Sequence, residues 1–95
     1  MNAPVDRRLL LLSEQDNVVI ALVNLQQGEV LRIDGNDVIL RVAVPLGFKI
    51  ARYGLAVGDK VFKYGAAIGS VTVAIVRGEV VHVHNMKSDY LPTHA

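Results

Sequence analysis

A short pattern built around glycine recurs along the chain and constrains its fold more than any other feature. Each copy has an apolar residue three places before the glycine, an acidic residue directly after it, and a valine soon after that. The three glycines are Gly28, Gly58 and Gly78. Glycine accepts the positive φ of a tight turn, and a strand can begin directly after such a turn. The pattern therefore predicts repeated tight turns, each followed by a short strand.

Runs of branched apolar residues lie between these turns and have the alternation typical of half-buried strands. The clearest pair, 30–33 and 38–42, flanks Asp34-Gly35-Asn36-Asp37, which is a strong hairpin signal. No long window has a clean helical period, and the sequence leaves room for one short helical turn near Leu25 or over 50–55. The predicted strands are 18–22, 30–33, 38–42, 61–63, 68–73 and 80–84.

The composition agrees with a single all-β domain. The chain has 95 residues, of which 52% are hydrophobic and only 5% aromatic. Branched aliphatic side chains pack well on the pleated surface of a sheet. A chain this short buries a modest fraction of its surface, and so high an apolar content suggests that part of that surface lies against another chain. The polar last stretch, 87–95, is expected to be an extended tail.

Charge and cysteine content exclude several classes of function. The net charge is +1, without a cluster of lysine and arginine, so nucleic-acid binding has no electrostatic basis. The absence of cysteine excludes disulfides and thiolate metal sites. Arg7 and Arg8 precede four leucines, which are too few for a signal-peptide core or a membrane span. We therefore expect a cytoplasmic protein with no membrane partner.

Two histidines form the strongest candidate site. His82 and His84 are two residues apart on the strand predicted over 80–84, and this spacing places both side chains on one face. Two neutral imidazoles so placed could ligate one divalent ion, such as Fe, Mn or Mg. Further ligands would come from His94, water or carboxylates of a partner. The alternative is that one imidazole is hydrogen-bonded at the sheet edge and the other faces solvent.

Three motifs in order resemble a known family. They are Pro45-Leu46-Gly47-Phe48-Lys49-Ile50-Ala51, then Lys63-Tyr64-Gly65 with Ile68-Gly69, then His82-Val83-His84-Asn85. This set resembles the SAF-type domain of the altronate and galactarate dehydratase family over about residues 13 to 88. It is equally similar to the free-standing small subunit of the related sulfolactate sulfo-lyase.

The resemblance implies a β-clip fold and a role in a lyase that removes water or sulfite from a hydroxy acid. It places an N-terminal extension at 1–12, the SAF-like domain at 13–86 and a tail at 87–95. Because the chain ends soon after the last motif, it resembles the separate small subunit, whose partner would be a large catalytic polypeptide. One position departs from the family pattern, since Phe48 stands where the family has histidine.

Dehydration of a sugar acid requires proton removal beside a carboxylate, which a bound metal favours. The chain could supply the histidines as metal ligands and Lys49 or Lys63 as the partner of the substrate carboxylate. Tyr64 could bond a substrate hydroxyl, or its phenol could simply face water. Asn85 could contact substrate, orient an imidazole or cap the strand end. No residue is assigned as catalytic, and a complete active site within this chain is not expected.

Two other interpretations remain open at this point. The domain could be a non-catalytic module that binds carbohydrate or takes part in assembly, and the aromatic ring of Phe48 favours this interpretation. The apolar surface could instead be the interface of a homo-oligomer.

Overall fold

The computed structural model describes residues 6–89, which form nine short strands and no helix. All strand pairs are antiparallel. Within this part of the chain no helix is long and apolar enough to cross a membrane. The prediction of an all-β domain with short strands is confirmed. The strands are β1 (Leu9–Leu10), β2 (Val18–Ala21), β3 (Val30–Ile33), β4 (Asn36–Ile39), β5 (Lys49–Ala51), β6 (Lys60–Lys63), β7 (Ala66–Val71), β8 (Val80–Val81) and β9 (Met86–Ser88).

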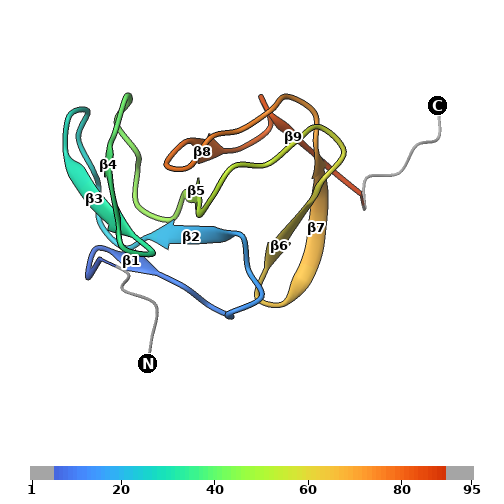
Figure 1. The fold of residues 1–95 in the computed structure, drawn as a ribbon, viewed down its shortest axis with the longest axis horizontal. Coiled ribbons are helices and arrows are strands. Elements are labelled where there is room, and N and C mark those ends of the chain that lie inside the picture. Colours follow the sequence, from blue (N-terminus) through green and yellow to red (C-terminus); the bar gives the residue numbers. More distant parts are fainter. Residues whose placement is uncertain (1–5, 90–95) are drawn as a thin grey trace.

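A central sheet, in the order β1-β2-β5-β8, separates two hydrophobic cores (Figure 1). The β3–β4 hairpin covers one face, and the β6–β7–β9 sheet covers the other. Successive residues of a strand point to opposite faces. Val19 and Ile50 accordingly lie in the core under β3–β4, whereas Val18 and Ala51 lie in the core under β6–β7. Burial on both faces explains why apolar residues follow one another in β2 and in the Ile50–Ala51 part of β5 rather than alternating with polar ones.

The glycine pattern forms four equivalent turns, one more than the sequence predicted. Each of the four glycines has a φ of 90° to 92°. In three of the turns, the acidic residue after glycine accepts a hydrogen bond from the main-chain N–H three places earlier, and this bond closes the turn. The bonds join Gln26 to Glu29 (2.6 Å), Ala56 to Asp59 (2.8 Å) and Val76 to Glu79 (2.7 Å). The fourth turn contains Gly47.

The two halves of the chain are built alike. In each half an isolated bridge joins two of these turns, Leu25 to Val44 in the first and Leu55 to Ile75 in the second. The main-chain bonds also match, because Gly28 donates to Leu40 just as Gly58 donates to Val71. A hairpin lies between the two turns of each half, β3–β4 in the first and β6–β7 in the second.

The two hairpins have the same tip geometry. Asp34 and Gly35 connect β3 to β4, and Tyr64 and Gly65 connect β6 to β7. All four residues have positive φ, as in the type I′ turns that match the twist of paired strands. The second hairpin differs by a β-bulge, since the register of β6 and β7 shifts after Val61.

Several predicted elements need correction. The strand predicted over 38–42 is β4, which begins at Asn36 because the two-residue turn ends at Gly35. The strand predicted over 80–84 ends at Val81, and the chain turns from there to Asn85. Part of the segment considered for a helical turn, 50–55, belongs to β5. Ordered strands also reach past both predicted domain boundaries, since β1 lies within 1–12 and β9 extends beyond 86.

We predict that Gly78→Ala destabilises the protein more than Gly28→Ala. Both positions have a φ of 90°, which costs an L-residue about 1–2 kcal/mol. A Cβ on Gly28 would meet open space, whereas one on Gly78 would overlap the side chain of Val38. The overlap should cost about 1–3 kcal/mol more. Urea unfolding of both variants measures the difference, and equal losses would contradict this account of the turn.

Candidate functional site

A groove of about 920 Å³ lies between β4 and the segment around β8. Its walls combine apolar side chains with charged and titratable ones, and it is broad enough to admit a small organic acid or an extended chain. Both predicted histidines line it. The residues that line the groove are Asn36, Asp37, Val38, Ile39, Arg41, Val42, Ala43, Pro45, Phe48, Val76, Arg77, Gly78, Glu79, Val80, His82 and His84.

The two histidines lie on a tight turn and not on the strand that the sequence predicted. The carbonyl of His82 accepts bonds from the main-chain N–H groups of Asn85 (3.1 Å) and Met86 (2.9 Å). The turn forms because β8 must reverse at once to lead into β9. Both residues are exposed and line the same groove, and an arrangement of their imidazoles on one face stays a prediction.

The buried side chain of Asn85 stabilises this turn by hydrogen bonds to its main chain. It is only 3% exposed. Its carbonyl oxygen accepts a bond from the N–H of His82, and its amide donates to the carbonyl of Val80, both at 2.9 Å. This geometry matches the capping role that the sequence left open for Asn85. A contact between Asn85 and substrate stays a prediction.

Phe48 packs directly against His82 in the groove. Their ring centroids are 5.1 Å apart and the planes are tilted by 33°. Phe48 occupies the place that Glu29, Asp59 and Glu79 fill in the other three turns. Here the residue three places earlier is Pro45, which has no N–H for a carboxylate to accept. The turn therefore does not need an acid, and the position is free to carry a side chain that faces the groove.

The groove also carries two arginines that the sequence did not single out. Arg41 has no hydrogen bond or ion pair among residues 6–89. Arg77 donates its Nε to the carbonyl of Arg52 at 3.0 Å, which fixes its guanidinium while leaving the charge unneutralised. The two acids of the groove are already engaged, Asp37 with Arg32 at 2.9 Å and Glu79 within its own turn. The groove is therefore more cationic than its composition suggests.

The two predicted lysines lie on the other side of the central sheet. Lys49 precedes Ile50 on β5, and Ile50 belongs to the core under β3–β4. Alternation therefore directs Lys49 toward the β6–β7 side, where Lys63 ends β6. Burial, with a smaller contribution from the charge of Lys63, lowers the pKa of Lys49. The lysines thus form a pair of cations separate from the histidine groove.

Tyr64 lies at the tip of the β6–β7 hairpin and is 78% exposed. Its main-chain N–H and that of Gly65 both donate to the buried carboxylate of Asp16, at 2.8 Å each. The carboxylate of Asp16 therefore holds the tip in shape. The phenol is free to meet water or a ligand, so the predicted bond to a substrate hydroxyl stays a prediction.

Within residues 6–89, no three side chains of histidine, cysteine, aspartate or glutamate lie close enough together to hold a metal ion. His82 and His84 therefore fit a divalent ion only as two ligands of a larger set. His94, the further ligand considered from sequence, lies outside the described residues. Any complete metal site at this turn requires ligands from water or from another chain.

Comparison with known proteins identifies a family over most of the chain. Residues 7–89 match the family model described as the altronate/galactarate dehydratase SAF domain. No curated protein matches the chain. The match spans both halves of the fold, the histidine turn and the lysine pair.

We predict that Lys63→Ala raises the pKa of Lys49 part of the way to its ordinary value of 10.5, because burial remains when the neighbouring charge is removed. Carbon-13 NMR of the lysine side chains measures the shift. Lys60→Ala is the matched control, since Lys60 also lies on β6 but pairs with Asp89 at 2.8 Å. An unchanged Lys49 pKa in Lys63→Ala would contradict the proximity of the two ammonium groups.

The lowered pKa of Lys49 makes the stability of the protein depend on pH. The unfolded chain holds the Lys49 proton more tightly than the folded chain does, so unfolding takes up a proton between the lowered pKa and 10.5. The contribution of Lys49 to stability therefore rises with pH across that window. Lys63→Ala should flatten this rise, and urea midpoints at several alkaline pH values measure it.

Proposed function

Because this chain belongs to the altronate/galactarate dehydratase SAF domain family, we propose that it is the small subunit of a sugar-acid dehydratase or a related hydroxy-acid lyase. In this proposal the chain is inactive alone and contributes binding residues to an active site that a large catalytic subunit completes. The observation that supports the proposal is the turn after β8, which places His82 and His84 on the wall of one groove that also carries Arg41 and Arg77.

A divalent ion such as Fe, Mn or Mg, when bound, would polarise the substrate carboxylate and favour loss of the neighbouring carbon-bound proton. His82 and His84 would hold that ion through two neutral imidazoles, on a turn that Asn85 keeps rigid. Arg41 and Arg77 would attract the carboxylate of a sugar acid into the groove, since no acid within residues 6–89 neutralises either charge.

The proposed reaction needs acid–base groups that a partner chain would supply. Dehydration needs a base for the carbon-bound proton and an acid for the departing hydroxyl. In the described part of the groove, Asp37 is paired with Arg32 and Glu79 closes its own turn. The remaining metal ligands and the acid–base groups would come from the large subunit.

The Phe48–His82 contact favours a second candidate function. An aromatic ring beside an imidazole offers a stacking surface for a sugar and no additional metal ligand. A non-catalytic module that binds carbohydrate or serves in assembly would keep this surface and need no metal. Metal binding by the histidines distinguishes the two functions.

We expect the chain to co-purify with a large polypeptide and to support hydro-lyase activity on altronate or galactarate, or sulfite release from sulfolactate, only in the mixture. In metal analysis of that complex after loading with Mn or Fe, His82→Ala and His84→Ala should each weaken metal binding by about tenfold or more. Val83→Ala is the matched control, because Val83 lies between the two histidines and is 78% exposed.

A gain-of-function variant supplies the reverse test. Phe48→His would place a third imidazole beside His82, so it should increase metal retention by the isolated chain and should do so only while His82 is present. Equal, negligible metal in the wild-type complex and all variants would remove the metal from the proposal and leave the carbohydrate-binding module.

A further inference from the structure

The outer edges of the two equivalent hairpins are covered in different ways. Each hairpin has two outer edges, on which alternate residues direct their main-chain N–H and C=O groups away from the partner strand. Such open edges invite pairing with other chains, and proteins normally cover them. The four edges belong to β3, β4, β6 and β7. How each is covered differs between the two halves.

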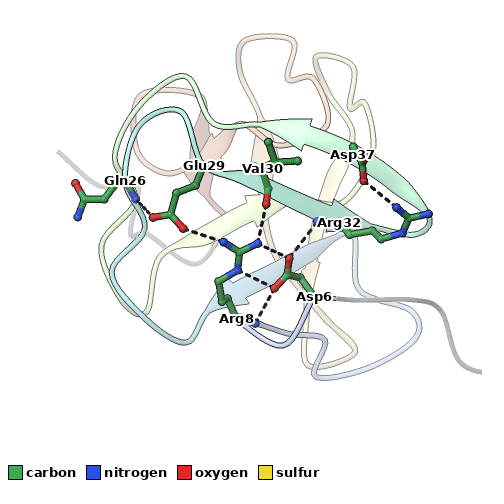
Figure 2. Close-up of polar contacts among 7 residues, drawn as sticks. All are labelled: Asp6, Arg8, Gln26, Glu29, Val30, Arg32 and Asp37. Carbon is green, nitrogen blue, oxygen red and sulfur yellow. Dashed lines mark hydrogen bonds and ion pairs between the residues drawn. The ribbon is translucent and has the colours of Figure 1, made fainter.

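The edge of β3 is covered by side chains from the start of the described chain (Figure 2). Arg8 donates to the carbonyl of Val30 at 2.6 Å, and the carboxylate of Asp6 accepts the N–H of Arg32 at 3.3 Å. The N–H of Asp6 donates in turn to the carbonyl of Arg32 at 3.1 Å. Arg8 also bonds Asp6 and Glu29, and its bonds to Asp6 lower the pKa of that carboxyl.

The edge of β6 is covered at the equivalent positions by one side chain. The amide of Asn17 donates to the carbonyl of Lys60 at 2.9 Å, and its oxygen accepts the N–H of Phe62 at 2.8 Å. The edge of β7 is covered by a strand, since β9 pairs with it from Gly69 to Val71. Beyond this pairing, the N–H of Thr72 donates to the carbonyl of Asn85 at 2.9 Å. Three of the four edges therefore carry hydrogen bonds to a covering group.

The edge of β4 has no such cover among the described residues. The N–H of Leu40 donates to Glu29 on the β3 side, so the alternation turns the main-chain groups of Ile39 and Asp37 outward. β4 pairs only with β3, and no other described residue bonds these outward groups. The side chain of Ile39 is 66% exposed beside them. This edge borders the histidine groove.

We propose that β4 receives an extended, acidic strand from a partner polypeptide, antiparallel to it as β9 is to β7. The strand would exchange main-chain hydrogen bonds with Asp37 and Ile39. Its apolar side chains would cover Ile39, Val42 and Val76, all of which are exposed and line the groove.

The positive charge of the groove favours an acidic strand over a basic one. Arg41 and Arg77 have no acidic partner in the part of the chain that the structure describes, whereas Asp37 is paired with Arg32. A carboxylate on the incoming strand would neutralise Arg41 and would also lie in the groove that His82 and His84 face. Identification of the donor as the large subunit rests on the proposed function, but the strand site itself does not.

The test uses the full chain labelled with nitrogen-15 and two blocked synthetic peptides. In one peptide valine and glutamate alternate, and in the other lysine replaces glutamate. We expect the glutamate peptide to shift the amide signals of Asp37, Ile39 and Arg41 in a saturable manner and to bind about fivefold or more tightly than the lysine peptide. Scattered shifts, or equal binding of the two peptides, would overturn the proposal.

Two variants separate the main-chain contacts from the charge. Ile39→Pro removes an outward N–H and leaves the hydrogen bonds to β3 in place, so it should abolish peptide binding. Ile39→Ala keeps the N–H, so it should still bind the glutamate peptide more tightly than the lysine peptide. Arg41→Glu should reverse the preference between the peptides, and it covers the case in which the proline variant fails to fold. An unreversed preference counts against the proposed electrostatics.

A second copy of the chain is the competing occupant. Protection of the Asp37 and Ile39 amides that rises with protein concentration, without peptide, would show self-pairing of β4 and overturn the proposed partner. Because none of these measurements involves metal or turnover, the strand site can fail while the lyase proposal stands. Conversely, peptide binding at β4 without a co-purifying large chain would refute the lyase partner and leave the strand site intact.

Discussion

The fold depends on a pair of strands that are buried on both faces. β2 and β5 send alternate side chains into two cores, so that Val18 and Val19, adjacent in sequence, stabilise opposite halves of the molecule. Neither hairpin could bury its apolar face without this shared wall, because an isolated two-stranded hairpin is marginally stable in water. The same two strands separate the candidate site residues, since the histidine turn lies on the side of the first core and Lys49 faces the second.

The turns and several strands could be predicted from the sequence, because residues within the same short segment determine them. Asp34-Gly35 forms the expected hairpin, since both residues tolerate positive φ. Tyr64-Gly65 forms an equivalent turn, but its support comes from Asp16, which is distant in the sequence. β5 and β9 were missed for a similar reason. Each is three residues long, and pairing with distant strands, not its own pattern, determines it.

The candidate site was predictable only where sequence neighbours are also spatial neighbours. His82 and His84 lie in one groove, yet the argument that grouped them assumed a strand where the chain turns. Lys49 was expected near them, and sheet order places it on the opposite face. Arg41 and Arg77 join the groove from separate halves of the chain. Their convergence reflects the packing of β4 against the turn that contains Gly78, which no local pattern records.

The differences between the equivalent halves are concentrated on one side of the molecule. Three turns need a carboxylate, and the fourth, freed of that need by Pro45, presents Phe48 to the groove. Over residues 6–89, three hairpin edges are covered, and the fourth, on β4, is open beside the same groove. A fold with two equivalent halves would tolerate a cover at each hairpin edge and the same turn sequence in each half, so stability alone does not account for these two departures. Because both departures occur around the histidine turn, the proposed interaction with another molecule at the groove would explain them together.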